Sequence, residues 1–310
     1  MQRTAFLMSL SGAEAALVPG EVVRGTYTVE ALLGAGAFSA VYKVRHRFLG
    51  VQAMKVFHRD RRAPNVEDVM KEAVILSGLQ DPHVVRVFEA NTTDGASAGW
   101  PYLTMEYAPG GTLEEHLERR VRLNPLSSLK TARQACAGLA AAHQAQPPIV
   151  HRDVKPQNIL LWGVSVNGTP QVKIGDFGLA QHVDPESLMT RAAGTIHYLA
   201  PEATWGYHSP TSDVYSLAVV LYRTLTGVFP FALPDEDDRR NLESMRSAVA
   251  RVRRTPAIPP SVFRLGLPSH IDGLVARALA PMPAERFTDA VEFGSALDRL
   301  IGEFTTGDPT

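Results

Sequence analysis

Residues 151–158 read HRDVKPQN, and the triplet DFG follows at 176–178, eighteen residues after the end of that stretch. Moving a phosphoryl group from ATP to a hydroxyl requires a carboxylate that orients the hydroxyl, and oxygen ligands that hold magnesium against the phosphates. Asp153 suits the first task, and Asn158 and Asp176 suit the second. The chemistry of these side chains therefore predicts a site for phosphoryl transfer.

A glycine-rich run lies upstream, where residues 33–41 read LGAGAFSAV. Gly34 and Gly36 let backbone amides approach phosphate oxygens without interference from side chains. Such a run is often only a tight turn, and it also opens dinucleotide-binding folds, in which a helix follows the glycines. Here residues 40–45, AVYKVR, alternate in polarity and favour a strand. We therefore expect a glycine-rich hairpin lying over a nucleotide.

A lysine and a glutamate form the next expected pair. Lys55 lies in the strand-like run VQAMKVF at 51–57, where apolar neighbours indicate that it points inward and needs an anionic partner. Glu72 is the best candidate, in the helical pattern VEDVMKEAVILSGL at 66–79. Taken singly, either residue is more often a solvated surface charge, but the surrounding motifs favour the pair.

Taken together and in this order, these motifs resemble the eukaryotic-type protein kinase family. The resemblance continues with TIHYLAPE at 195–202, with DVYSLAVVLY from Asp213, and with PAERF around Arg286. It spans about residues 20–301, and the richness in alanine and arginine leans toward bacterial serine/threonine kinases.

The resemblance implies an α+β, bilobal fold. The N-lobe is expected at 21–107, as a small antiparallel β-sheet with one key helix, and the larger, mainly helical C-lobe at 108–303. Residues 1–20 are expected to be a flexible lead-in rather than a signal peptide, and 304–310 a disordered tail or the start of a linker. A domain cut from a longer receptor would look the same.

The resemblance also gives each matching position a role. Asp153 would orient or deprotonate the substrate hydroxyl, and Lys155 would neutralise charge on the transferring phosphoryl group. Lys55 would contact the phosphates and pair with Glu72. The ligands of Mg²⁺, with Mn²⁺ as the alternative ion, would be Asn158 and Asp176. The other nucleotide-binding positions would be Leu33, Gly34, Gly36, Val41, Ala53, Met105 as gatekeeper, Glu106 and Ala108 through their backbone groups, and Leu160.

Substrate and regulation are partly readable from the same comparison. Lys155, two residues after Asp153, resembles serine/threonine rather than tyrosine kinases. Thr112 and Gln157 stand where kinases that choose basic substrates often carry glutamate, so no preference for arginine is expected. The regulatory candidates are Thr190 first and Ser187 second, as autophosphorylation sites with Arg152 as basic partner. Because Gln181 and Asp68 replace further basic groups, we expect a weak switch.

Composition is compatible with this interpretation. The formal net charge is -1 over 310 residues, so the chain lacks the excess of positive charge that would favour binding to nucleic acid or an anionic membrane. The chain has no apolar run near the ~18 residues of a membrane helix. Its single cysteine, Cys136, allows no internal disulfide and fits the reducing cytoplasm, for the chain alone or as the cytoplasmic domain of a longer protein.

Two other function classes stay open. A pseudokinase scaffold would share the fold and bind nucleotide without catalysis, although such chains usually lose a catalytic lysine, aspartate or metal ligand, and none is lost here. A small-molecule phosphotransferase usually lacks the arginine and lysine of HRDVK and the APE segment, both of which are present. We therefore expect an ATP-dependent kinase that acts on protein substrates bearing serine or threonine. The sequence contains no indication of its oligomeric state.

Overall fold

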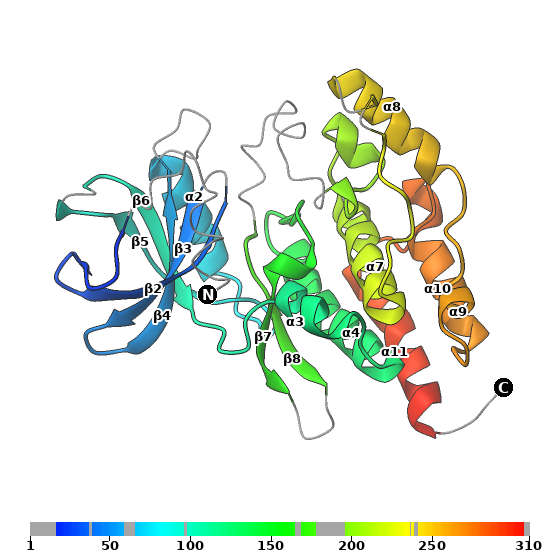
Figure 1. Cartoon of the computed structure of the whole chain (residues 1–310), viewed down its shortest axis with the longest axis horizontal. Coiled ribbons are helices and arrows are strands. Elements are labelled where there is room, and N and C mark those ends of the chain that lie inside the picture. The colour runs from blue at the N-terminus through cyan, green and yellow to red at the C-terminus, as the bar shows by residue number, and fades with distance from the viewer. Residues whose placement is uncertain are drawn as a thin grey trace. The chain divides into compact units, whose positions relative to one another are not determined.

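The computed structural model divides the chain into two compact units. One holds residues 1–78 and 86–107, and the other holds 79–85 and 108–310. The described residues are 17–36, 39–58, 66–95, 98–164, 169–177, 196–235, 237–238 and 241–306. The first unit is built around a sheet and the second is mainly helical, which confirms the expected α+β class (Figure 1).

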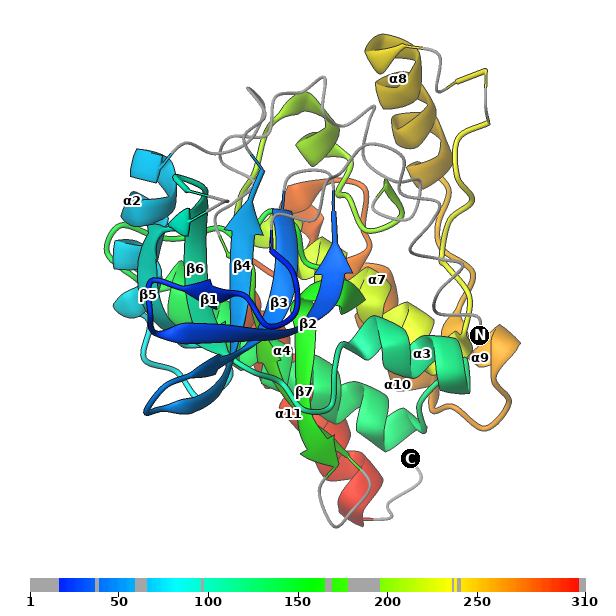
Figure 2. The ribbon, with the colours of Figure 1, turned by 60° about the vertical axis from the view of Figure 1, so that its left-hand side comes forward.

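The first unit contains a six-stranded antiparallel sheet in the order β1-β2-β3-β4-β6-β5. Its strands are β1 (Val22–Val23), β2 (Tyr27–Ala35), β3 (Ser39–His46), β4 (Gly50–Phe57), β5 (Val87–Thr92) and β6 (Pro101–Glu106). Helix α2 (Val66–Ser77) lies beside β5 and β6 (Figure 2). Its stripe Val69, Ala73 and Leu76 is buried, as its periodicity predicts.

The two faces of this sheet have different uses, because successive side chains of a strand point to opposite faces. On one face a buried core gathers around Tyr42, Met54 and Tyr102, and Leu17 from before the first strand joins it. The alternate positions of the same strands belong to the other face. They include Lys55 and Met105, so one strand contributes both to the core and to the expected nucleotide-binding set.

The second unit is a helical body with one small hairpin. Its α-helices are α3 (Leu113–Arg120), α4 (Pro125–His143), α7 (Pro210–Thr226), α8 (Leu242–Arg253), α9 (Pro260–Phe263), α10 (Ser269–Ala278) and α11 (Ala290–Thr306). Its short 3₁₀ turns are η2 (Pro156–Asn158), η4 (Glu202–Trp205) and η5 (Pro283–Glu285), and the hairpin strands are β7 (Ile159–Val164) and β8 (Pro170–Ile174). Helix α11 continues to Thr306, beyond residue 303 at which the sequence predicts the lobe to end.

Helices α4, α7 and α11 pack together and form the core of this unit (Figure 1). Helix α7 is buried over nearly its whole length, in agreement with the apolar run that begins at Val214. Cys136 of α4 is also buried. After Asn158 the strands β7 and β8 form an antiparallel hairpin, and residues 165–168 between them lie outside the described residues. Among the helices of the described part, none combines the length and apolar character that a bilayer crossing requires.

Helix α3 begins with a favourable capping arrangement and ends at a residue with an unfavourable backbone conformation. Thr112 and Glu115 form a capping box, in which the threonine hydroxyl accepts the Glu115 N–H at 3.1 Å. At the other end Val121 closes the helix with φ 63° and ψ -47°, a positive-φ conformation that β-branched residues rarely adopt. This cap position normally favours glycine.

Replacing Val121 with Gly is expected to raise the free energy of unfolding by roughly 1 kcal/mol, because glycine adopts this backbone conformation without strain. The Val121 side chain is 63% exposed, so little packing is lost. Chemical denaturation measures the change. Val121→Ala is the control, since alanine keeps the Cβ and the strain; a gain of stability in the alanine variant as large as in the glycine variant would contradict this explanation.

Candidate active site

The glycine-rich segment forms the expected hairpin in the first unit. Gly34 lies opposite Val41 across the β2–β3 pair, and the Gly36 N–H donates to the Ser39 carbonyl at 2.8 Å. A strand follows the glycines, so the dinucleotide alternative is wrong for this run. A Cβ added to Gly34 would meet no described atom within 4 Å. Packing against the described residues therefore does not require glycine here, and room for a phosphate is a reason for it. Leu33, which precedes Gly34, is exposed, and residues 37–38 lie outside the described part.

Strands β3, β4 and β6 bring four of the predicted residues together through their register. Val41 lies directly opposite Lys55, and Ala53 lies directly opposite Met105. Lys55 is only 6% exposed, with its ammonium 5.7 Å from the centre of the Phe57 ring. These residues share one face of the sheet because paired residues point the same way.

Glu72 lies in α2, but its side chain falls outside the described atoms. Its ion pair with Lys55 therefore stays a prediction.

The chain passes from the first unit to the second between Tyr107 and Ala108, just after β6. Glu106 ends β6, and its backbone N–H donates to the Arg86 carbonyl at 3.0 Å. The Ala108 N–H has no hydrogen-bond partner among the described residues, so it is available to a ligand. Leu160 lies in β7, paired with Lys173 of β8.

Three of the predicted catalytic and metal-binding residues meet in the second unit. The Lys155 ammonium lies 2.9 Å from Asp153 Oδ2. The Asn158 amide donates from Nδ2 to the Asp153 carbonyl at 2.8 Å and to its Oδ2 at 3.3 Å. This donation fixes the orientation of the amide and directs Asn158 Oδ1 away from Asp153. The turn η2 supplies the short spacing that lets these side chains converge.

A buried carboxylate on α7 holds this loop in place. Asp213 is 1% exposed and accepts the backbone N–H groups of His151 at 2.7 Å and Arg152 at 2.9 Å. Its third partner is His143 Nε2, at 3.0 Å. Sequence reasoning missed His143, because a histidine at the end of an alanine-rich helix carries no signal of this contact. The bonds to Asp213 stabilise Arg152 at φ 68°.

His151 is a structural residue of the site. Its Nε2 donates to the Gly175 carbonyl at 2.9 Å, and its Nδ1 accepts the Asp153 N–H at 3.3 Å. Its ring lies 4.6 Å from that of Phe177. Because both ring nitrogens are engaged, His151 has no lone pair to offer a metal ion. Its hydrogen bond to Gly175 holds the segment that carries Asp176. The backbone of Asp176 has φ 61°.

The donor set of the predicted metal site suits magnesium. Asn158 Oδ1 accepts no hydrogen bond from the described residues, and a carboxylate from Asp176 completes an oxygen-only pair. Magnesium in nucleotide sites typically takes one or two protein ligands and fills the rest with phosphates and water. Within the described residues no three His, Cys, Asp or Glu side chains gather as a larger metal cluster.

Arg152, the predicted basic partner of a phosphorylated residue, has a buried Nε without a hydrogen-bond partner among the described residues. Thr190 and Ser187 lie outside the described residues.

His197, in the TIHYLAPE segment, carries a pH dependence of stability. Burial, followed by the charges of Arg253 and Arg223, lowers its pKa from 6.5 to about 4, and its ring stacks on Phe229 at 3.6 Å. Between these pKa values the unfolded chain binds a proton that the folded protein does not, so stability is expected to fall as the pH drops from 6.5 toward 4.

The measurement is the free energy of unfolding against pH for the parent and for His197→Phe, which keeps an aromatic ring but cannot titrate. A smaller loss between pH 6.5 and pH 4 is expected in the variant. Parallel curves would contradict the assignment.

Comparisons with known proteins agree with this geometry. Residues 27–297 match the model of the protein kinase domain. A probable serine/threonine-protein kinase of Clostridium perfringens is 31% identical over 91% of this chain, which spans 39% of that relative. PknB of Mycobacterium tuberculosis is 34% identical over 88% of the chain, and PknL of the same species is 36% identical over 89%. The chain spans 42% of PknB and 66% of PknL, so these relatives are longer proteins.

Solved structures support the same assignment. The PknI kinase domain of Mycobacterium tuberculosis, solved with one cysteine replaced by alanine, is 27% identical, with a TM-score of 0.66 over 91% of this chain and 98% of that domain. Its fold, with the sheet of the first unit and the helices of the second, confirms the predicted protein kinase fold. The match to the family model covers the glycine-rich hairpin, the loop around Asp153 and the late arginine Arg286. The chain therefore belongs to the protein kinase family.

Proposed function

We propose that this chain transfers the γ-phosphoryl group of ATP to serine or threonine hydroxyls of proteins. The observation that carries the proposal is the convergence of Lys155 and Asn158 on Asp153, at 2.9 Å and 2.8 Å. This arrangement gives a carboxylate beside an ammonium and an oriented amide, which is the set that phosphoryl transfer needs. Lys155 supports the preference for serine and threonine, and so does the similarity to bacterial proteins named as serine/threonine-protein kinases.

Each residue has a distinct task in the proposed reaction. Asp153 orients the acceptor hydroxyl and takes up its proton as the new oxygen–phosphorus bond forms and the bond to the ADP oxygen breaks. Lys155 offsets the negative charge of the transferring group. Asn158 and Asp176 hold Mg²⁺, which neutralises charge on the phosphates when bound.

Most of the residues proposed to bind the nucleotide lie in the first unit, and Ala108 and Leu160 lie in the second. Lys55 contacts the α and β phosphates, and Gly34 and Gly36 leave room for the phosphates to approach the backbone of the hairpin. The free N–H of Ala108 donates to the adenine edge, with the Glu106 carbonyl as the neighbouring acceptor. Val41 and Ala53 contact the adenine ring, with Leu33 and Met105 at its margins, and Leu160 is the adenine contact proposed on the second unit.

We further propose autophosphorylation at Thr190 and then Ser187, with Arg152 as the basic partner of the phosphate. The unpartnered Nε of Arg152 among the described residues supports this role. Peptide mapping after incubation with ATP tests it, and an unmodified Thr190 and Ser187 would contradict it. The cytoplasm is the proposed location, because ATP is available there and the one cysteine is a buried thiol.

Incubation of the purified chain and its Asp176→Asn variant with labelled ATP, Mg²⁺ and a protein acceptor tests the activity. Label on serine or threonine with the parent alone is expected. Labelling of neither, with Mg²⁺ and ATP still bound, would contradict the proposal and favour a nucleotide-binding scaffold. Labelling of a small alcohol with no labelled protein would contradict it in favour of a small-molecule phosphotransferase.

A further inference from the structure

A short loop from outside the catalytic motifs lies against the strand that leads to Asp176. Residues 79–85 belong to the second unit, although the residues before and after them belong to the first. Val84 forms a parallel bridge with Ile174 of β8. Two backbone hydrogen bonds flank it: the Ile174 N–H donates to the His83 carbonyl at 2.8 Å, and the Val85 N–H donates to the Ile174 carbonyl at 2.9 Å. The loop therefore acts as an additional strand at the edge of the β7–β8 hairpin.

The side chain of His83 forms a further hydrogen bond between this loop and β8. Its Nδ1 lies 3.0 Å from the Val172 carbonyl. A carbonyl only accepts, so Nδ1 carries the hydrogen and donates. The backbone of His83 is itself fixed, because its N–H donates to Asp81 Oδ1 at 2.7 Å. A Cβ added to Gly138 of α4 would stand 2.5 Å from the His83 carbonyl and 2.8 Å from Ile174 Cγ2, so α4 is in close contact with both the loop and β8.

The contacts of the loop at 81–85 extend along the chain to Gly175, the residue directly before the predicted metal ligand Asp176. Gly175 follows Ile174, and a Cβ added to it would stand 3.2 Å from Val85 Cγ2. Its N–H donates to the Asn158 carbonyl at 2.9 Å, and its carbonyl accepts from His151. Asp176 comes next, with φ 61°. A non-glycine residue keeps this conformation only when its surroundings over-determine it, and the loop at 81–85 is one of the segments that do so.

We propose that His83 is a positioning residue for Asp176: its imidazole fastens residues 81–85 to β8, and the affinity of the site for Mg²⁺ depends on this bond. The inference rests on the proposed function, because it takes Asp176 as a ligand of Mg²⁺. His83 itself does not touch the ion or the substrate. Groups that orient a metal ligand commonly change metal affinity by about 10- to 100-fold when they are removed.

The test measures the Mg²⁺ dependence of ADP binding by calorimetry, which needs no catalytic turnover. In His83→Ala, the Mg²⁺ concentration for half of the gain in ADP affinity is expected to rise on the order of tenfold. ADP affinity without Mg²⁺ is expected to stay at the parent value. His83→Asn is the rescue variant, because its amide can donate from nearly the position of Nδ1, and parent-like Mg²⁺ dependence is expected.

Gln134→Ala is the matched control. The Gln134 side chain bonds the Pro170 carbonyl at 2.9 Å and the Val172 N–H at 3.1 Å, so it supports the same strand without contacting the loop at 81–85. We expect this variant to lower the melting temperature as His83→Ala does, but to keep the Mg²⁺ dependence of the parent. His83→Leu, which removes the donor but keeps volume, carries the test if the alanine variant does not fold.

A parent-like Mg²⁺ dependence in the folded variant that lacks the His83 donor would overturn the inference. An equal shift in Gln134→Ala would also overturn it, because the cause would then be general loosening of β8. An absence of any Mg²⁺ effect on ADP binding by the parent would instead contradict the proposed function, so the two failures are distinguishable.

Discussion

Replacing Asp153 with Asn is expected to lower the rate of phosphorylation by roughly 10²- to 10⁴-fold while ATP affinity stays close to that of the parent. The carboxylate holds the Lys155 ammonium at 2.9 Å and accepts from Asn158, and an asparagine preserves the shape but not the charge or the basicity. Because its proposed task is to orient and deprotonate the acceptor hydroxyl, the loss should appear in kcat. Steady-state phosphorylation of a protein acceptor gives kcat, and calorimetry gives ATP affinity.

Asp298→Asn is the matched control for this variant. Asp298 is half-exposed on α11 and pairs with Arg133 at 2.8 Å, so it receives the same change of charge without contacting the proposed site. We expect its kcat to equal that of the parent. A loss of ATP affinity in Asp153→Asn as large as its loss of rate would contradict the assigned role.

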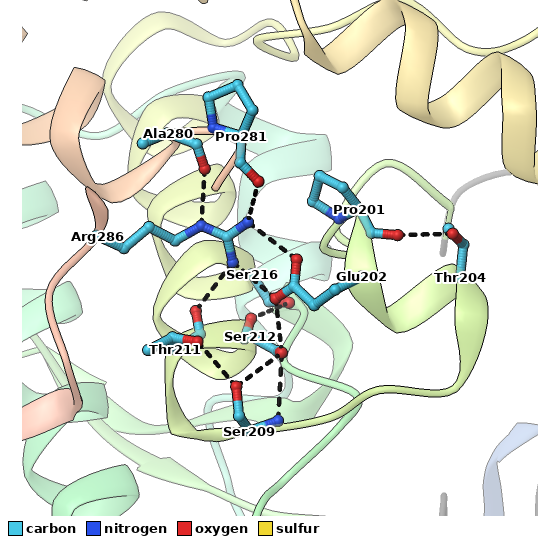
Figure 3. Close-up of polar contacts among 10 residues, drawn as sticks. All are labelled: Pro201, Glu202, Thr204, Ser209, Thr211, Ser212, Ser216, Ala280, Pro281 and Arg286. Carbon is cyan, nitrogen blue, oxygen red and sulfur yellow. Dashed lines mark hydrogen bonds and ion pairs between the residues drawn. The ribbon is translucent and has the colours of Figure 1, made fainter. Parts of the chain in front are cut away.

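The second large effect is on stability. Replacing Arg286 with Met is expected to cost about 3–5 kcal/mol of unfolding free energy, because it leaves the Glu202 carboxylate without its buried partner. Arg286 forms a two-pronged bond to Glu202, at 2.7 Å and 2.9 Å, and its other donors reach the carbonyls of Ala280 and Pro281 (Figure 3). The Arg286 side chain is fully buried.

This pair joins segments far apart in the sequence. Glu202 also accepts from the Ser212 hydroxyl at the start of α7, at 2.8 Å, so the contact connects the APE segment, α7 and the turn before α11 (Figure 3). Burial raises the pKa of Glu202, but the hydrogen bond and charge of Arg286 outweigh it, and the net pKa is lowered. Methionine keeps much of the volume, so the expected loss comes from the unpaired carboxylate.

Arg251→Met is the control for this prediction. Arg251 contacts Asp238 at 2.7 Å, but its side chain is 65% exposed, and exposed pairs contribute only about 0–1 kcal/mol. Thermal and chemical denaturation of both variants give the comparison. Equal losses of unfolding free energy in the two variants would contradict the prediction that burial makes the Arg286–Glu202 pair strongly stabilising.

Much of the site could be predicted from the sequence because its motifs are short and their chemistry is local. The segment around Asp153 places a carboxylate, an ammonium and an amide within six residues, so one turn brings them together. The alternation after Gly36 distinguished a strand from a helix, and the periodicity around Glu72 predicted α2. In these cases the backbone geometry of one element decides which side chains meet.

Only the tertiary structure decided which distant groups hold those motifs. His143 and Asp213 support the catalytic loop from two different helices, and His83 reaches Val172 across 89 positions of sequence. The fold places them beside the site by the packing of α4, α7 and β8, and no pattern within the sequence encodes such distances. The sequence by itself determined the fold class, the family resemblance and the reacting groups, because these depend on residue type and local spacing. The contacts that fix their positions depend on long-range packing, and only the folded chain specifies them.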